Sequence, residues 1–168
     1  MVDAPPGYEP AEPPLLVGGS EADQDQLLQL YYRFRVINDA LDGEALRQVW
    51  SAAPENVFFN SNGHTYYGLD DWMKIWDYYR PRMEAVKPGG SGQIRVFARD
   101  EMAVIIDDHS GHTRVRRWTR ASTTPTIVEN ACSRVTLVCV REKNAWKVMH
   151  AHFSVTRHER RPDQGGNE

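Results

Sequence analysis

The sequence has few cysteines. Cys132 and Cys139 are the two present, seven positions apart in a stretch that alternates like a strand. On a single strand they would lie roughly 23 Å apart, at about 3.3 Å per residue, and would point to opposite faces. A disulfide requires Cα atoms within about 7 Å. We therefore expect no intramolecular disulfide and a reduced, cytoplasmic protein.

The chain also lacks a long apolar run and a strong charge. No stretch approaches the roughly 18 apolar residues of a membrane-spanning helix, and residues 1–6 lack the basic start and apolar stretch of a secretory signal. The formal net charge of −3 gives no reason to expect nucleic acid or a membrane surface as a partner. The 168 residues, 40% hydrophobic and 26% charged, suffice for one globular domain with its own core.

Three segments differ in composition. Residues 1–19 hold five prolines and end in Gly18-Gly19, which is typical of an extended arm rather than a folded unit. Residues 20–156 carry the periodic apolar patterns of secondary structure. Residues 157–168 are charged and glycine-rich, as in a frayed terminus. We expect one folded domain between a proline-rich arm and a flexible tail.

The central segment predicts helices first and strands afterwards. Ser20 and Asp23 form a capping-box pattern ahead of a helix whose apolar positions run from Leu27 to Leu41. A short helix at 45–50, a hairpin over 57–67 and a third helix at about 70–80 follow. Strands are predicted over 93–98, 102–107, 114–120, 127–141 and 145–156. This order predicts an α+β fold in which helices cover one face of a curved antiparallel sheet.

The last predicted strand contains Trp146–Ser154. Because side chains alternate across a strand, Trp146, Val148, His150 and His152 should share one face. That face is either the wall of a polar-tipped pocket or a core face with two hydrogen-bonded histidines. The two imidazoles can also supply half of a metal site, but no further strand supplies a third ligand. We predict no metal.

These residues resemble a known superfamily. Three parts of the chain carry the resemblance. The first is the helix end Val36-Ile37-Asn38-Asp39-Ala40-Leu41-Asp42, and the second is the stretch Asn56-Val57-Phe58-Phe59, which is followed by Gly68 and a helix. The third is the ending, with Arg134-Val135-Thr136, Trp146-Lys147-Val148 and His150-Ala151-His152-Phe153-Ser154. They are similar to the nuclear transport factor two-like superfamily, and within it to the SnoaL-like and ketosteroid-isomerase-like proteins. The ending also resembles the association domain of calcium/calmodulin-dependent kinases.

The resemblance covers roughly residues 20–156 and implies a cone. In such a cone a strongly curved antiparallel sheet wraps around three helices and leaves a pocket between them. The resemblance further implies enzymes that use no metal or organic cofactor, and dimers formed through the outer face of the sheet. The fold also hosts binding modules and assembly domains, so the fold alone does not define a function.

Candidate catalytic residues lie on the last two strands. Imidazole titrates near neutral pH, so His150 or His152 can act as a general acid or base. The resemblance implies that family members usually carry a histidine at the position of His152, which favours a structural role for this residue. His150 is therefore the better catalytic candidate. The planar guanidinium of Arg134 can hold an oxyanion, or instead pair with a buried carboxylate such as Glu129 or Asp107.

The first helix supplies a second set of candidates. The ketosteroid isomerases have on this helix a tyrosine that donates a hydrogen bond to an oxyanion. The resemblance aligns this tyrosine with Tyr31 or Tyr32. Packing in the core is the alternative role for both residues. The same enzymes carry a catalytic aspartate in the first strand, where this chain has Phe59-Asn60. The base must then be a histidine or Asp107.

Further side chains are predicted to line the pocket. Aromatic residues concentrate in the helices and the hairpin at the opening of the cone, which favours a flat, ring-bearing ligand. The predicted substrate-binding residues are Asn38, Asn60, His64, Trp72, Trp76, Tyr79, Arg116 and Trp118. The arginines around Trp118 could instead form a solvated face or an intersubunit surface. Among these arginines, only Arg116 is kept as a candidate pocket residue.

Together these features predict a cofactor-independent acid–base enzyme acting on a small aromatic or polycyclic molecule. It would be a lyase or isomerase that performs dehydration, retro-aldol cleavage or cyclisation. A non-catalytic ligand-binding or assembly domain of the same fold is the alternative, and a hydrolase with a pocket-held water is a third option. We expect a homodimer through the outer face of the sheet.

Overall fold

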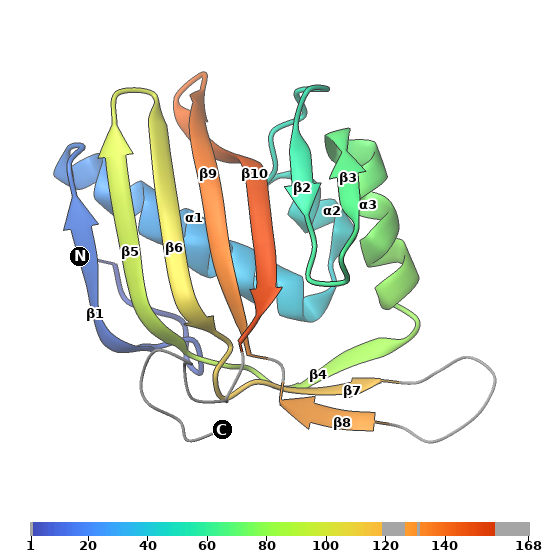
Figure 1. Cartoon of the computed structure of the whole chain (residues 1–168). Coiled ribbons are helices and arrows are strands. Elements are labelled where there is room, and N and C mark those ends of the chain that lie inside the picture. The colour runs from blue at the N-terminus through green and yellow to red at the C-terminus, as the bar shows by residue number, and fades with distance from the viewer. Residues whose placement is uncertain (1, 119–126, 131, 157–168) are drawn as a thin grey trace, which may run out of the picture.

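The protein has a mixed α+β fold (Figure 1). The computed structural model describes residues 2–118, 127–130 and 132–156. The helices are α1 (Glu21–Ala40), α2 (Gly43–Arg47) and α3 (Gly68–Tyr79). The strands are β1 (Pro10–Val17), β2 (Val57–Phe59), β3 (Thr65–Tyr67), β4 (Met83–Lys87), β5 (Ser91–Arg99), β6 (Met102–Ser110), β7 (Val115–Trp118), β8 (Ile127–Asn130), β9 (Ser133–Glu142) and β10 (Ala145–Val155).

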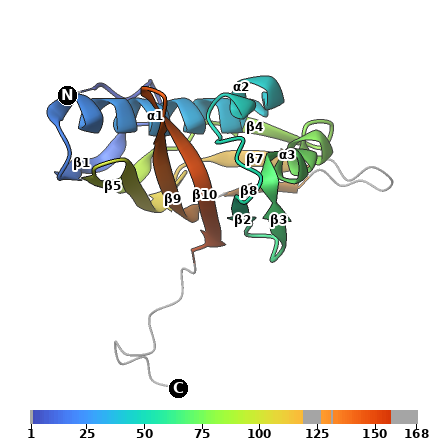
Figure 2. The same ribbon diagram turned by 90° about the horizontal axis from the view of Figure 1, so that it is seen from above.

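A large curved sheet is packed against the helices. Its strand order is β1-β5-β6-β9-β10-β2-β3, and β4, β7 and β8 form a separate small sheet. Figure 1 shows α1 running behind the large sheet, and Figure 2 shows from above that the sheet lies to one side of this helix. The prediction of a curved sheet wrapped around three helices is confirmed. Two pairings depart from the predicted antiparallel pattern, since β1 pairs with β5 and β10 with β2 in parallel.

The first helix follows its sequence pattern. The Ser20 side chain accepts a hydrogen bond from the Asp23 amide, and Asp23 accepts one from the Ser20 amide, which completes the predicted capping box. Asp23 also forms an ion pair with Arg141 on β9, and the guanidinium of Arg141 lies 4.4 Å from the ring centre of Trp146. The start of α1 is thereby tied to the β9–β10 hairpin.

The proline-rich segment belongs to the sheet. Pro10–Val17 forms β1, in which Pro10 lies opposite Ser91 of β5, and the register shifts where Pro13 and Pro14 stand. Proline has no amide hydrogen, so it is tolerated at a sheet edge, and β1 is an edge strand. The segment is extended as predicted, but the prediction that it is not part of a folded unit is wrong.

The predicted strand over 127–141 is two strands in different sheets. Its first part, β8, pairs with β7 in the small sheet, and its second part, β9, lies between β6 and β10. Cys132 therefore precedes β9 instead of sharing a strand with Cys139, and both cysteines are free thiols. The split allows the chain to contribute to both sheets within a few residues.

A β-bulge interrupts the pairing of β9 with β10. Val148 lies opposite Cys139, whereas His150 lies opposite Val138, so Met149 is an extra residue on β10. An extra residue shifts the alternation by one and moves every following side chain to the other face.

The bulge changes the environment of the histidines. Before it, Trp146 and Val148 are 5% and 0% exposed; beyond it, Ala151 is 0% exposed and faces the core. His150 and His152 consequently lie on the outer face of the sheet. The prediction that they share a face with Trp146 and Val148 is wrong for this reason.

Candidate functional site

A cavity of about 220 Å³ lies between the helices, the β2–β3 hairpin and the concave side of the sheets. One wall is aromatic and the other is polar. The aromatic wall contains Phe34, Trp72, Trp76, Tyr79 and Phe153, and the polar wall contains Arg35, Asn38, Ser110, Arg114 and Arg116. Asn60, Ser61, Cys132 and Ser133 are among the other lining residues.

The aromatic wall is rigid because its rings pack on one another. The Trp72 ring is stacked with Phe58 at 5.0 Å between centres and with Phe153 at 6.0 Å. It meets the edge of Trp76 at 5.7 Å, and Trp76 in turn meets Tyr79 at 6.3 Å. Offset and edge-to-face pairs of this kind hold rings in place, so this wall is formed before any ligand enters.

The first polar cluster joins Arg35 and Tyr31 of α1 to Asp107 of β6. The Tyr31 hydroxyl donates to Asp107 Oδ2 at 2.5 Å, and Arg35 Nη1 lies 3.4 Å from the same oxygen. Arg35 also donates to Ser91 Oγ at 2.9 Å and to the Gly89 carbonyl at 2.5 Å. Burial raises the pKa of Tyr31, which keeps its hydroxyl protonated as the donor.

The second polar cluster joins Asp39 of α1 to two arginines around β7. Arg114 Nη1 lies 3.0 Å from Asp39 Oδ1, with both side chains at most 4% exposed. Arg116 Nη2 lies 3.6 Å from the same oxygen. Burial, followed by the charge of Arg114, lowers the pKa of Arg116 to about 10, so the group remains a cation near neutral pH.

The two clusters leave an excess of positive charge at the cavity. Among the described side chains, the guanidinium groups of Arg35, Arg114 and Arg116 meet two buried carboxylates, Asp39 and Asp107. The Nε of Arg35 is buried and has no hydrogen-bond partner among the described residues. A buried donor without a partner is costly to the fold.

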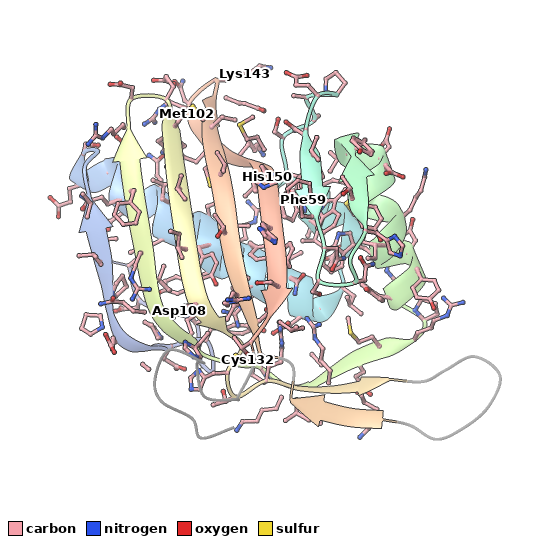
Figure 3. The ribbon with its side chains drawn as sticks, viewed as in Figure 1. Phe59, Met102, Asp108, Cys132, Lys143 and His150 are labelled. Carbon is pink, nitrogen blue, oxygen red and sulfur yellow. The ribbon has the colours of Figure 1, made fainter. Side chains whose placement is uncertain are left out.

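The predicted catalytic histidines lie away from this cavity. His150 and His152 both form edge-to-face pairs with the exposed Phe59, at 5.1 Å and 5.7 Å between ring centres. Figure 3 shows Phe59 and His150 together on the outer face, where β10 meets β2. The Nδ1 of His150 donates to the Val57 carbonyl at 2.5 Å. Arg134 is also exposed and donates to Ser154 Oγ at 3.1 Å.

The other predicted site residues divide into three groups. Asn38, Asn60, Trp72, Trp76, Tyr79 and Arg116 line the cavity. Tyr31 lies behind the polar wall, Tyr32 is buried without lining the cavity, and His64 is exposed in the hairpin turn. Trp118 pairs with Met83 through its backbone, and its side chain lies outside the described part of the chain.

Sequence reasoning missed Arg35, Asp39 and Arg114 as site residues. Arg35 and Asp39 follow Tyr31 at spacings of four residues on α1, so one helix face carries a hydroxyl, a cation and an anion. An arginine and an aspartate at core-facing positions of an apolar helix are the signal that could have found them, because such charges are buried only when paired.

Among the residues that the structure describes, no cluster of three or more histidine, cysteine, aspartate or glutamate side chains could hold a metal ion. Over the same residues, no helix has the length and apolar character needed to cross a membrane.

A curved sheet that packs against three helices, with a pocket between them, defines a cone-type fold, and comparison with known proteins assigns its family. Residues 26–158 match the SnoaL-like domain, and the chain belongs to this family. No curated protein sequence matches the chain.

Solved structures show the same fold at low identity. A candidate dehydratase of the nuclear transport factor 2-like family from Streptomyces avermitilis superposes with a TM-score of 0.64 at 12% identity, over 82% of this chain and 99% of the other. A candidate calcium/calmodulin-dependent kinase II association domain from Exiguobacterium sibiricum has a TM-score of 0.61 at 12% identity, over 84% and 99%. A related protein of unknown function from Pseudomonas putida has a TM-score of 0.57 at 18% identity, over 82% and 89%.

Proposed function

We propose that the protein binds a small, ring-bearing organic anion in the cavity. The ring would lie against Trp72, Trp76 and Phe153, and the anionic group would meet the three arginines of the polar wall. The observation that carries this proposal is the charge of that wall, where three guanidinium groups meet two buried carboxylates among the described side chains. An anionic ligand would form charge-assisted hydrogen bonds with this wall, above all with Arg116, whose side chain is 19% exposed.

The size of the cavity supports a ligand of one ring. An apolar protein cavity of about 150 Å³ accepts benzene. The cavity here, at about 220 Å³, has room for a single ring with a carboxylate or a short side chain.

Binding of benzoate and of its neutral analogue benzamide tests the proposal. Wild-type protein should bind benzoate more tightly, as measured by calorimetry. An Arg116→Gln variant should bind benzoate about 10- to 100-fold more weakly, the effect of losing one charge-assisted hydrogen bond of about 1.5–3 kcal/mol. Benzamide affinity should change little, because the ring contacts remain.

Arg117→Gln is the matched control. This neighbouring arginine pairs with Glu84 and is 48% exposed, so its loss should leave both affinities unchanged. Equal affinity of wild-type protein for the acid and the amide would contradict an anion site. An equal loss in the two arginine variants would contradict the assignment of Arg116.

A second candidate function is proton transfer of the lyase or isomerase class. It is favoured by a chain of hydroxyl groups that leads from the cavity to a buried carboxylate. Ser110 lines the cavity, its Oγ lies 3.5 Å from the Tyr31 hydroxyl, and that hydroxyl donates to Asp107. Tyr31 and Asp107 would then replace the histidines as the acid–base groups, with the arginines stabilising an oxyanion. The structural similarity to a candidate dehydratase agrees with this class.

Exchange of a carbon-bound proton with D2O tests this chemistry. Phenylpyruvate, a ring-bearing anion with an acidic CH2 group, should exchange faster with wild-type protein than in buffer, as followed by NMR. Tyr31→Phe should abolish the acceleration, whereas His150→Ala should retain it. A rate equal to that in buffer would leave binding without catalysis, the alternative predicted from the sequence.

The homodimer predicted through the outer sheet face stays a proposal. That face carries Phe59, Phe97 and Met102, which are 41%, 40% and 53% exposed. Apolar side chains at this density are typical of surfaces that bury themselves against a partner. Sedimentation equilibrium of wild-type protein and a Phe97→Glu variant would test it, because the charge should shift a dimer toward the monomer.

A further inference from the structure

The arm ahead of β1 reaches the polar wall of the cavity. These residues, 2–9, lie outside the segment 26–158 that matches the SnoaL-like domain. The arm runs along the flank of α1: the charge of Asp3 acts on Tyr32, and Tyr8 lies beside Arg35 and Asp39 further along the helix. Tyr8 is 9% exposed.

The arm is seated on the loop between β4 and β5. The Tyr8 amide donates to the Pro5 carbonyl at 3.0 Å, which closes a turn, and the Ser91 amide donates to the Glu9 carbonyl at 3.3 Å. The fit is close, since a Cβ atom on Gly90 would come within 2.5 Å of the Glu9 oxygen. Gly7 has a φ of +84°, and a Cβ there would come within 2.7 Å of the Pro88 ring.

Tyr8 interacts with both polar clusters. The guanidinium of Arg35 lies 5.7 Å from the centre of the Tyr8 ring and 5.9 Å from that of Tyr31, within the range of cation–π contacts. Burial, followed by the negative charge of Asp39, raises the pKa of Tyr8 to about 12. The phenol therefore lies beside the Asp39 carboxylate and stays protonated.

We propose that Tyr8 is a positioning residue for the anionic group of the ligand. Its ring fixes the guanidinium of Arg35, and its neutral phenol lies on the side of Asp39, which pairs with Arg114 and Arg116. The arm thus completes a site that the matched domain does not complete by itself. This inference rests on the proposed binding of a ring-bearing anion.

The geometry separates this role from direct ligand contact. Tyr8 is not among the residues that line the cavity, whereas the arginines that it contacts directly or through Asp39 are. Loss of Tyr8 should therefore weaken recognition of the anionic group and spare the ring contacts at Trp72. A residue that merely stabilised the fold would weaken both equally.

The first experiment compares benzoate and benzamide with the full chain by calorimetry. Tyr8→Ala should weaken benzoate binding at least about tenfold, the effect of about 1.4 kcal/mol, and change benzamide binding less than about twofold. Tyr8→Phe keeps the ring on Arg35 and should lose only part of that affinity. Tyr78→Ala is the matched control, because Tyr78 also lies under an arginine, Arg82 at 4.2 Å, but does not line the cavity.

The second experiment needs no ligand. A guanidinium that its neighbours hold in place rotates slowly about its Nε–Cζ bond and gives separate NMR signals for its two Nη atoms. Arg→Lys variants show which arginine each signal belongs to. Tyr8→Ala and Tyr8→Phe should be compared with wild-type protein for the signals of Arg35 and Arg114. Alanine should speed the exchange between the two Arg35 Nη signals relative to wild-type protein, and phenylalanine should leave it unchanged.

The outcomes separate the two proposals. Wild-type protein that binds neither probe contradicts the proposed function, and the NMR comparison then decides alone whether Tyr8 holds the arginines. Wild-type selectivity for benzoate that survives in Tyr8→Ala, or Arg35 signals unchanged by that variant, overturns the role of Tyr8. If Tyr8→Ala weakened the binding of benzoate and benzamide equally and also lowered the melting temperature, Tyr8 would have a structural role. That result would also overturn the positioning role proposed for Tyr8.

Discussion

An Asp107→Ala variant should lose about 3–5 kcal/mol of unfolding free energy, because breaking a buried ion pair leaves its partner charged and without compensation. Asp107 is 0% exposed. Its side chain accepts hydrogen bonds from Tyr31, Arg35 and the His109 amide. Alanine removes these acceptors and leaves the Arg35 guanidinium, 1% exposed, buried without its paired carboxylate. Urea denaturation of the two proteins measures the loss.

Asp108→Ala is the control for this prediction. Asp108 is the next residue and also pairs with an arginine, but the pair is on the outer face, where Arg95 and Asp108 are 31% and 41% exposed. Exposed ion pairs contribute about 0–1 kcal/mol. Equal effects of the two substitutions would contradict the buried charge cluster. Asp107→Asn, which keeps an acceptor for Tyr31 but not the charge, should fall between wild type and alanine.

Trp72→Ala should cost a similar amount, about 3–5 kcal/mol, for a different reason. The indole is 0% exposed and fills the space between Phe58, Phe153 and Trp76. Alanine leaves a void in the aromatic wall that stacked rings cannot close without losing their own contacts. Denaturant unfolding measures the stability, and benzamide affinity should fall together with that of benzoate because the ring contact is lost.

Two further variants refine this result. The indole Nε1 of Trp72 has no hydrogen-bond partner among the described residues, so Trp72→Phe should lose ring area but no hydrogen bond and be milder. Tyr67→Ala removes an aromatic side chain that is 68% exposed and should change stability by less than about 0.5 kcal/mol. A Trp72→Ala loss as small as that of Tyr67→Ala would show that the aromatic wall is not packed as described.

Local patterns predicted the parts of the fold that local physics controls. The capping box at Ser20 and Asp23, the apolar stripe of α1 and the hairpin before α3 all follow from neighbouring residues. The aromatic wall was predicted for the same reason, since Trp72 and Trp76 lie four residues apart on one helix face. These interactions do not depend on how distant strands pair.

The position of the histidines could not be predicted in this way. Strict alternation places His150 and Trp146 on one face, and the sequence carries no glycine to mark the bulge at Met149. The bulge depends on the register between β9 and β10, which the whole sheet sets. The same limit applies to Arg35, whose partner Asp107 is 72 residues away in the sequence and is brought near only by the sheet.

The parallel pairing of β1 with β5 has a consequence for synthesis. Pro10–Val17 leaves the ribosome early, but its partner strand, Ser91–Arg99, emerges only after all three helices and the β2–β3 hairpin have been made. Until then the segment is an unpaired strand, the kind of element that promotes aggregation in nascent chains. Its prolines reduce that hazard, because a strand that lacks amide hydrogens at several positions is a poor template for intermolecular pairing. The residues that lower the stability of the finished edge therefore protect the unfinished chain.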